Sequence, residues 1–311
     1  MLRLLLLLWL FVTLFSIELA AQSEDISIQL AKIKQQEDKS EAVKKTNQLL
    51  KQQHLTSSQI IEALLLQSRN HLSLNEFDQA MLTSKKAGEL AAEKQLFEQQ
   101  AKAHKLQGIV AYYQGDYSQA VNYYQTSLKY FQDLTQKQTK IDISKVAIIQ
   151  ANLFNNIALA QTAQGNSFAA LASYQQAEPL YQQYGNEVDK IDIRYNIATL
   201  YISLRRFDMA INMFKQTIVK RGVLGDEYGV ATATADLAVA YKYSGQYLQA
   251  KKYNFVALQY FKKHNHQFNT ASQLNNIAEL YYELEQMDNV LLYANKCIEI
   301  SKKIGHQRAY V

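Results

Sequence analysis

Polar side chains that can hydrogen-bond to a peptide backbone recur along this chain at intervals of forty residues, at Asn156, Asn196, Asp236 and Asn276. Asparagine is a mediocre helix former, so its recurrence in a helix-favouring sequence needs a reason. One reason is recognition, because a side-chain amide both donates to and accepts from an extended peptide backbone. The other is common ancestry of the repeats, which needs no ligand. We favour recognition, and both explanations stay open.

Further polar and aromatic residues flank this row. Asn155 and Asn275 directly precede two of its members, and Tyr195, Tyr243 and Tyr282 lie close to it in the repeats. We expect these side chains together to hold an extended segment of a partner. Many of the chain's 21 tyrosines fall instead on the apolar positions of the repeat and are assigned to the core.

Residues for catalysis or metal binding do not accompany the row. The sequence has no Gly-rich phosphate loop, no His-Glu-x-x-His and no Gly-x-Ser-x-Gly. His264 and His266 could supply two metal ligands, but they lack a partnered cysteine or acidic cluster, so we interpret them as solvated. Cys297 is the only cysteine and has small counterparts in earlier repeats, which predicts a buried packing residue. We therefore predict neither an enzyme nor a cofactor or metal site.

The charge of the chain is small and evenly mixed. There are 33 basic and 28 acidic residues, a formal net charge of +5. This balance does not favour a nucleic-acid surface, so we expect a protein or peptide as the partner. Basic pairs recur where helices are expected to end, and there they complement the helix dipole; they are Lys220-Arg221, Lys262-Lys263 and Lys302-Lys303.

The elements that position these residues are predicted to be helices. One proline and ten glycines in 311 residues favour long uninterrupted helices over strands and turns. Small residues recur at intervals of forty residues, and once of fifty. Twelve residues beyond each comes a second small residue, so two helices can touch closely. The first set is Ser68, Gly108, Ala158, Ala198, Ala238 and Ala278; the second is Ala80, Ala120, Ala170, Ala210 and Ala250, with Val290 as a bulky replacement.

A turn and an aromatic residue separate the members of each pair. Gly115, Gly165 and Gly245 are placed to end a helix in the left-handed conformation that glycine adopts at little cost. The aromatic residue that follows the turn is expected to close the helical hairpin. It is Phe77, Tyr117, Phe207 or Tyr247.

This pattern resembles the tetratricopeptide repeat over roughly residues 62–305, and residues 108–128 match it best. The forty-residue period exceeds the common thirty-four and is similar to that of kinesin light chains and cell-polarity adaptors. The resemblance implies an all-α, right-handed superhelix of antiparallel hairpins that binds peptides on its concave face, in some adaptors through an asparagine row. The family's usual tryptophan is replaced by His104, Phe154, Arg194, Thr234 and Leu274.

The repeats divide the chain into four parts. Residues 1–21 are predicted to be a signal peptide, 26–60 a degenerate first hairpin, 61–305 an array of six repeats, and 306–311 the start of a possible further repeat. We expect the array to form one elongated domain. Between the second and third clear repeats the spacing grows by ten residues, around 133–144, which either lengthens a helix or forms a loop.

Two functions fit this organisation. The first is an exported scaffold that binds a protein or peptide in its concave groove. The alternative is the input region of a bacterial signalling protein whose output would be a diguanylate cyclase, a histidine kinase or a transcriptional regulator. The genomic sequence beyond the codon for Val311 tests the alternative.

Export is predicted from the first residues. A charged start at Arg3, an apolar stretch over residues 4–17 and small residues ending at Ala21 follow in the order of a signal peptide. The apolar stretch is shorter than the roughly 18 to 20 residues that span a bilayer, which favours cleavage over a retained anchor. We expect sequencing of the exported protein to give an N-terminus near Gln22, in the periplasm or medium. An intact Met1 on a cytosolic product would contradict this.

Overall fold

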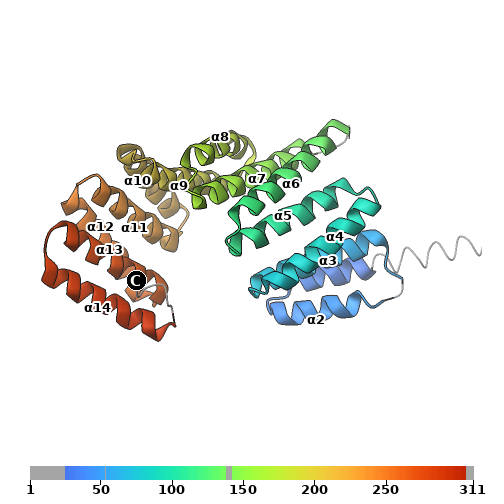
Figure 1. Ribbon diagram of the computed structural model, residues 1–311, viewed down its shortest axis with the longest axis horizontal. Coiled ribbons are helices and arrows are strands. Elements are labelled where there is room, and N and C mark those ends of the chain that lie inside the picture. Colours follow the sequence, from blue (N-terminus) through green and yellow to red (C-terminus); the bar gives the residue numbers. More distant parts are fainter. Residues whose placement is uncertain (1–24, 53, 138–141, 306–311) are drawn as a thin grey trace, which may run out of the picture. The chain divides into compact units, whose positions relative to one another are not determined.

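The computed structural model describes residues 25–52, 54–137 and 142–305 (Figure 1). Within these ranges the regular elements are all helices, which confirms the predicted all-α class. Residues 25–35 form a helix, and the later helices are α2 (Lys39–Leu49), α3 (Ser57–Ser73), α4 (Phe77–Glu93), α5 (Phe97–Tyr113), α6 (Tyr117–Lys137), α7 (Ile143–Ala163), α8 (Ser167–Tyr184), α9 (Glu187–Ser203), α10 (Phe207–Val223), α11 (Glu227–Tyr243), α12 (Tyr247–Lys263), α13 (Gln267–Glu283) and α14 (Met287–Lys303).

The chain divides into two compact units, residues 1–165 and 166–311. In the first unit α3 packs against α4 and α5 against α6; in the second α9 packs against α10, α11 against α12 and α13 against α14. The predicted signal peptide and the predicted start of a further repeat lie outside the described residues. The predicted domain boundaries at 61 and 305 stay predictions.

Turns of one kind set the period. Most of the helices are 17 residues long and are joined by three-residue turns, so two helices and two turns make forty residues. In each such turn the second residue has a positive φ, as Gly245 does at 76°. The next amide, that of Gln246, donates to the Tyr241 carbonyl at 2.9 Å and so satisfies a carbonyl that the helix end leaves open. The same conformation occurs at Asn75, Gln95, Gly115, Gly165, Arg205, Gly225, Asn265, Glu285 and Gly305.

The small residues lie where the helices touch. Ser68 is fully buried on α3, and its hydroxyl donates to the Ala80 carbonyl on α4 at 2.8 Å. The equivalent first-helix residues are buried on α7, α9, α11 and α13, and the second-helix alanines have no exposed surface. The predicted equivalence of these residues between repeats is confirmed. The first-helix residues are Ala158, Ala198, Ala238 and Ala278, and the second-helix residues are Ala80, Ala120, Ala170, Ala210 and Ala250.

Eight of the ten additional residues lengthen two helices. Helices α6 and α7 each have 21 residues instead of 17. Asp142 caps the start of α7, because its carboxylate accepts from the Ser144 amide at 3.1 Å. Of the two structures that the spacing left open, the described residues therefore adopt the longer helices.

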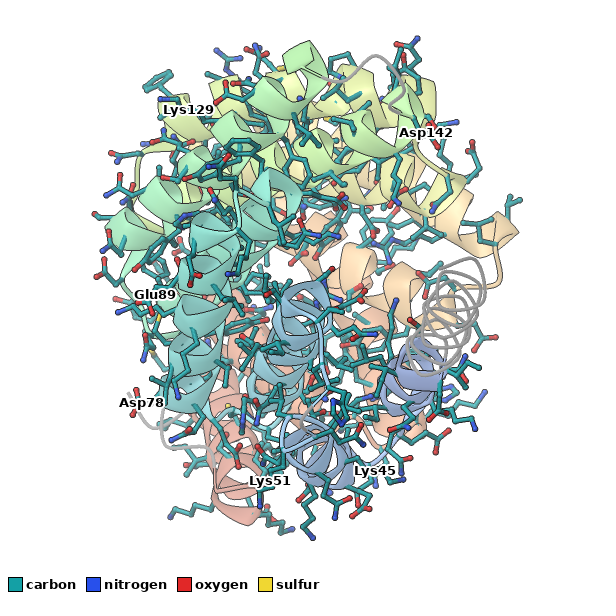
Figure 2. The ribbon with its side chains drawn as sticks, turned by 90° about the vertical axis from the view of Figure 1, so that its right-hand side faces the viewer. Lys45, Lys51, Asp78, Glu89, Lys129 and Asp142 are labelled. Atoms are coloured by element: carbon teal, nitrogen blue, oxygen red, sulfur yellow. The ribbon has the colours of Figure 1, made fainter. Side chains whose placement is uncertain are left out.

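The surface carries charges of both signs. Figure 2 shows Lys51, Asp78, Glu89 and Lys129 pointing away from the helices of the first unit, and all four are exposed. Cys297 is 4% exposed and packs in an apolar cluster with Leu274 and Tyr281, as expected for a packing residue. Among the described residues, no helix combines the length and apolarity that crossing a membrane requires.

Two glycine-to-alanine substitutions within helices are expected to have opposite effects on stability. A Cβ atom at Gly108 would lie 2.5 Å from Cε1 of Tyr124, whose ring is buried and has little room to move. We expect Gly108→Ala to destabilise the first unit by about 1 to 3 kcal/mol through overpacking. At Gly222 the nearest atom to such a Cβ is 4.0 Å away. Gly222→Ala should stabilise its helix by about 0.5 to 1 kcal/mol.

Urea unfolding of the two variants and the natural chain, followed by circular dichroism, measures both effects. If the free energy of unfolding changed equally and in the same direction in both variants, a close helix contact at Gly108 would be contradicted.

Candidate binding surface

The predicted binding residues lie on the first helices of the hairpins. Tyr195 and Asn196 are on α9, Asp236 and Tyr243 on α11. Asn275, Asn276 and Tyr282 lie on α13. Asn155 and Asn156 lie on α7, which belongs to the first unit. Within the second unit α11 contacts both α9 and α13, so these three first helices are neighbours although a second helix separates each pair in the sequence.

Two of the predicted residues bond to each other. The Tyr195 hydroxyl on α9 donates to a carboxylate oxygen of Asp236 on α11. Burial raises the pKa of Asp236 to about 6, and the hydrogen bond from Tyr195 acts in the opposite direction. Burial and the charge of Asp236 raise the pKa of Tyr195. This pair links neighbouring repeats and leaves the second carboxylate oxygen of Asp236 as its remaining acceptor.

A second bridge joins α11 to α13 and was not predicted. The Lys242 ammonium donates to Glu279 at 2.5 Å, and the Asn275 amide donates to the other oxygen of the same carboxylate at 2.8 Å. The ammonium also lies 4.7 Å from the centroid of the Tyr243 ring. Lys242 is 8% exposed, so this cation is neutralised where water has little access.

Sequence reasoning missed Lys242 and Glu279 because their positions do not repeat. Lys242 lies four residues after the small residue Ala238, and the other repeats carry unlike residues there, Thr162, Ile202 and Tyr282. The one signal in the sequence that could have identified them is that each lies on a first helix, shortly after its small residue.

Arg221 forms a third polar network, at the end of α10. Its guanidinium donates to Asp192 and to Asp226, each at 2.7 Å, and lies 5.4 Å from the centroid of the Tyr195 ring. Burial raises the pKa of Asp192, against the influence of Arg221. A Cβ atom at Gly229 would come within 2.1 Å of the guanidinium, so the network requires glycine there. Arg221 lies in the last turn of α10, as predicted, and its side chain also links this helix to α9 and to the start of α11.

The remaining predicted residues differ in exposure. Tyr243 is 55% exposed and stacks on Phe207 of the preceding hairpin, with ring centroids 6.2 Å apart. Tyr282 is 61% exposed on α13. Asn196 and Asn276 are half-buried, and within residues 142–305 no side-chain hydrogen bond engages the Asn276 amide. This surface thus combines paired charges, open tyrosines and amide groups.

The histidines interpreted as solvated belong to an aromatic cluster. The His264 ring stacks on Tyr260, with centroids 4.4 Å apart, and the His266 ring lies 5.0 Å from that of Tyr228. In the described part of the chain, no group of three or more histidine, cysteine or acidic side chains is arranged to hold a metal ion.

The ionisation of Asp236 should make stability depend on pH. A carboxyl whose pKa is raised from 3.8 to about 6 binds its proton more tightly in the folded chain. Its contribution to stability is therefore largest below pH 3.8, falls as the pH rises to about 6, and stays low above that. In Asp236→Asn this loss is absent, so the stability of the variant relative to the natural chain should increase across the same interval.

Urea unfolding at a series of pH values measures the difference, and Glu283→Gln, an exposed change on α13 that also removes one negative charge, is the control. If the difference in free energy of unfolding between the natural chain and Asp236→Asn did not change with pH, the raised pKa of the Asp236 carboxyl would be contradicted.

Residues 149–218, which include most of α7, all of α8 and α9 and the larger part of α10, match the family model described as "Tetratricopeptide repeat". No curated protein sequence matches the chain significantly.

Solved structures with a similar fold have low sequence identity. The apo form of RapI has a TM-score of 0.68 at 14% identity, over 89% of this chain and 77% of its own. NprR in complex with its cognate peptide NprX has a TM-score of 0.63 at 17% identity, over 92% and 81%. Aspartyl phosphate phosphatase F from Bacillus subtilis has a TM-score of 0.61 at 15% identity, over 92% and 76%. Identities this low establish the fold alone.

Proposed function

We propose that this chain, a tetratricopeptide-repeat protein, binds an extended segment of a partner protein across the first helices of its second unit. The observation that carries the proposal is the polar surface of α9, α11 and α13, on which Asn196, Asp236 and Asn276 stand at equivalent places of successive repeats. The exposed Tyr243 and Tyr282 lie on two of the same helices. NprR, which has a similar fold, has been solved with a bound peptide. A repeat scaffold that holds a peptide fits both findings.

The spacing of the helices suits a peptide backbone. Neighbouring helices pack roughly 10 Å apart, and an extended chain advances about 3.3 Å per residue. Asn196 on α9 and Asn276 on α13 stand two first helices apart, roughly 20 Å, so these two rungs could serve peptide residues about six positions apart. The amides would bond to main-chain groups, and the exposed Tyr243 and Tyr282 would cover the peptide's side chains.

The bridges between the helices give this surface a fixed geometry. Tyr195 with Asp236, and Lys242 with Glu279, tie each first helix to the next. Rigid positioning lowers the entropy that binding costs. We assign Tyr195 and Asp236 mainly to this positioning and Asn196 and Asn276 to contact with the ligand, so the predicted row has two kinds of members.

We infer binding without catalysis, since the sequence carries no recognised catalytic motif. We also propose that the protein works outside the cytoplasm. The support is the order of charged, apolar and small residues up to Ala21.

Removing two rung amides should weaken binding and leave the fold intact. Each neutral hydrogen bond contributes about 0.5 to 1.5 kcal/mol net. Asn196→Ala with Asn276→Ala should therefore lower the affinity of the chain for a bound peptide by roughly five- to 150-fold. Asn156→Ala alone, on α7 of the first unit, tests whether the earlier residue of the row also contacts a ligand. Asn212→Ala with Asn289→Ala removes two amides from second helices, one exposed and one half-buried, and is the matched control.

The ligand for this titration is a peptide selected on the natural chain from a displayed random library, measured by fluorescence anisotropy. Unchanged affinity of the rung variant, with a normal melting temperature, would reject the amide row. A collapsed melting temperature would show that these asparagines are structural.

A further inference from the structure

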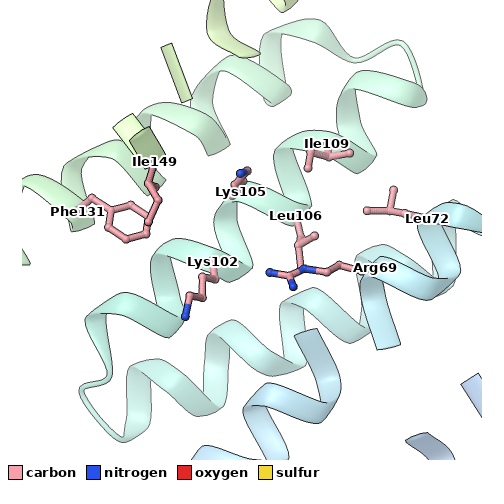
Figure 3. Close-up of a pocket in the computed structure, with 8 residues that line it drawn as sticks. All are labelled: Arg69, Leu72, Lys102, Lys105, Leu106, Ile109, Phe131 and Ile149. Carbon is pink, nitrogen blue, oxygen red and sulfur yellow. The ribbon is translucent and has the colours of Figure 1, made fainter. Parts of the chain in front are cut away.

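A pocket of about 380 Å³ lies on the first unit and joins basic to apolar side chains. Its walls come from α3, α5, α6 and α7 (Figure 3). In that view Phe131 and Ile149 lie together at one end and Leu72 and Ile109 at the other, and Arg69 reaches from α3 toward α5. The volume is in the range of ligand sites, which are usually apolar with a few placed polar groups.

The cations of this pocket are not neutralised by carboxylates in its walls. Arg69, Lys102 and Lys105 line it, and no acidic residue does. Lys102 pairs with Glu98 at 2.6 Å, but within the described ranges no ion pair engages Arg69 or Lys105. Burial and the charge of Arg69 lower the pKa of Lys105. Like charges held together beside apolar walls are unfavourable and are relieved by a bound anion.

A second hollow, of about 700 Å³, continues this surface. It is lined by the helix of residues 25–35, by α3 and by α5, and it shares Arg69 and Lys102 with the first pocket. It adds the cation Lys34 and the carboxylate Glu62. Four cations and one carboxylate thus line a surface that crosses several neighbouring helices, and a surface of that length favours an extended occupant over a compact one.

Two cations of the second unit show the opposite balance. Lys242 on α11 meets Glu279, and Arg221 on α10 meets both Asp192 and Asp226. The unmatched cations of the first unit are therefore not a general property of the repeat. They distinguish the ligand that this unit accepts.

We propose that the first unit binds a peptide segment in which acidic residues adjoin large apolar ones, with a carboxylate between Arg69 and Lys105 and apolar side chains against Leu72, Ile109, Phe131 or Ile149. The proposal rests on the function proposed above and adds the chemistry of the partner. Among the unmodified side chains of a peptide, a carboxylate is the group that pairs with both guanidinium and ammonium. The apolar walls exclude a purely acidic tail as the preferred ligand, because such a tail leaves them exposed to water.

The test is a selection on the full chain. Random peptides of about ten residues, long enough at roughly 3.3 Å each to cross three helices, are displayed without a free C-terminus and selected on four proteins. These are the natural chain, Arg69→Gln with Lys105→Gln, the rung variant Asn196→Ala with Asn276→Ala, and a control. The control, Lys51→Gln with Lys129→Gln, also removes two positive charges from the first unit, at exposed sites (Figure 2).

Peptides from the natural chain and from the control should be enriched in Glu or Asp beside Phe, Leu or Ile. That enrichment should disappear with Arg69→Gln and Lys105→Gln and persist with the rung variant. A synthetic selected peptide should bind the Arg69→Gln, Lys105→Gln chain at least about tenfold more weakly, and more weakly in high salt, because a charge pair is lost. The melting temperature of this variant should be unchanged or higher, because a repulsion is removed.

Pools without acidic enrichment, or equal pools from the natural chain and Arg69→Gln with Lys105→Gln, would overturn the proposal even if peptides depend on Asn196 and Asn276. Loss of binding in the rung variant alone would support only the function proposed for the second unit. Displacement of the selected peptide by decanoate at a concentration matching that of the peptide would identify a free apolar acid as the occupant. That result would overturn the proposal of a peptide ligand. Displacement by decanoate only at concentrations where it forms micelles supports the peptide.

Discussion

The close approach of two helices at small buried residues is the constraint on which this structure depends. Ser68 bonds to the backbone of the facing helix, and at Gly108 the Tyr124 ring occupies the space of a missing Cβ. The positive-φ turn returns the chain for this contact after each helix of standard length. First helices thereby become neighbours of first helices, and side chains about forty residues apart in sequence meet. The Tyr195–Asp236 bridge is such a meeting.

The same arrangement lets each unit present its own chemistry without changing the fold. The contacts within a hairpin use small and apolar residues, so the outward positions of the first helices are free to vary. In the second unit these positions hold paired charges and amides, as at Glu279 and Asn275. In the first unit they hold Arg69 and Lys105, which have no carboxylate in the pocket they line.

The fold was predictable because the packing residues repeat, and the interactions of the binding surface were only partly predictable because they do not. Small residues every forty positions gave the helices and their contacts, and the spacing around residues 133–144 left a helix or a loop open. Lys242 and Glu279 each occur in one repeat, so no period marked them as a pair. Arg221 was interpreted through the helix dipole alone, because its partner Asp192 lies 29 positions away. The pocket at Lys105 depends on which carboxylates are missing nearby, and a sequence does not display that.

The position of a bound peptide tests the central claim most directly. Amide chemical shifts of the isotope-labelled chain, recorded during titration with a selected peptide, map the contact. The account predicts that the perturbed amides cluster on first helices, on α9, α11 and α13 for peptides that depend on Asn196 and on α3 and α5 for those that depend on Lys105. Perturbations confined to the second helices α4, α10, α12 and α14 would contradict it.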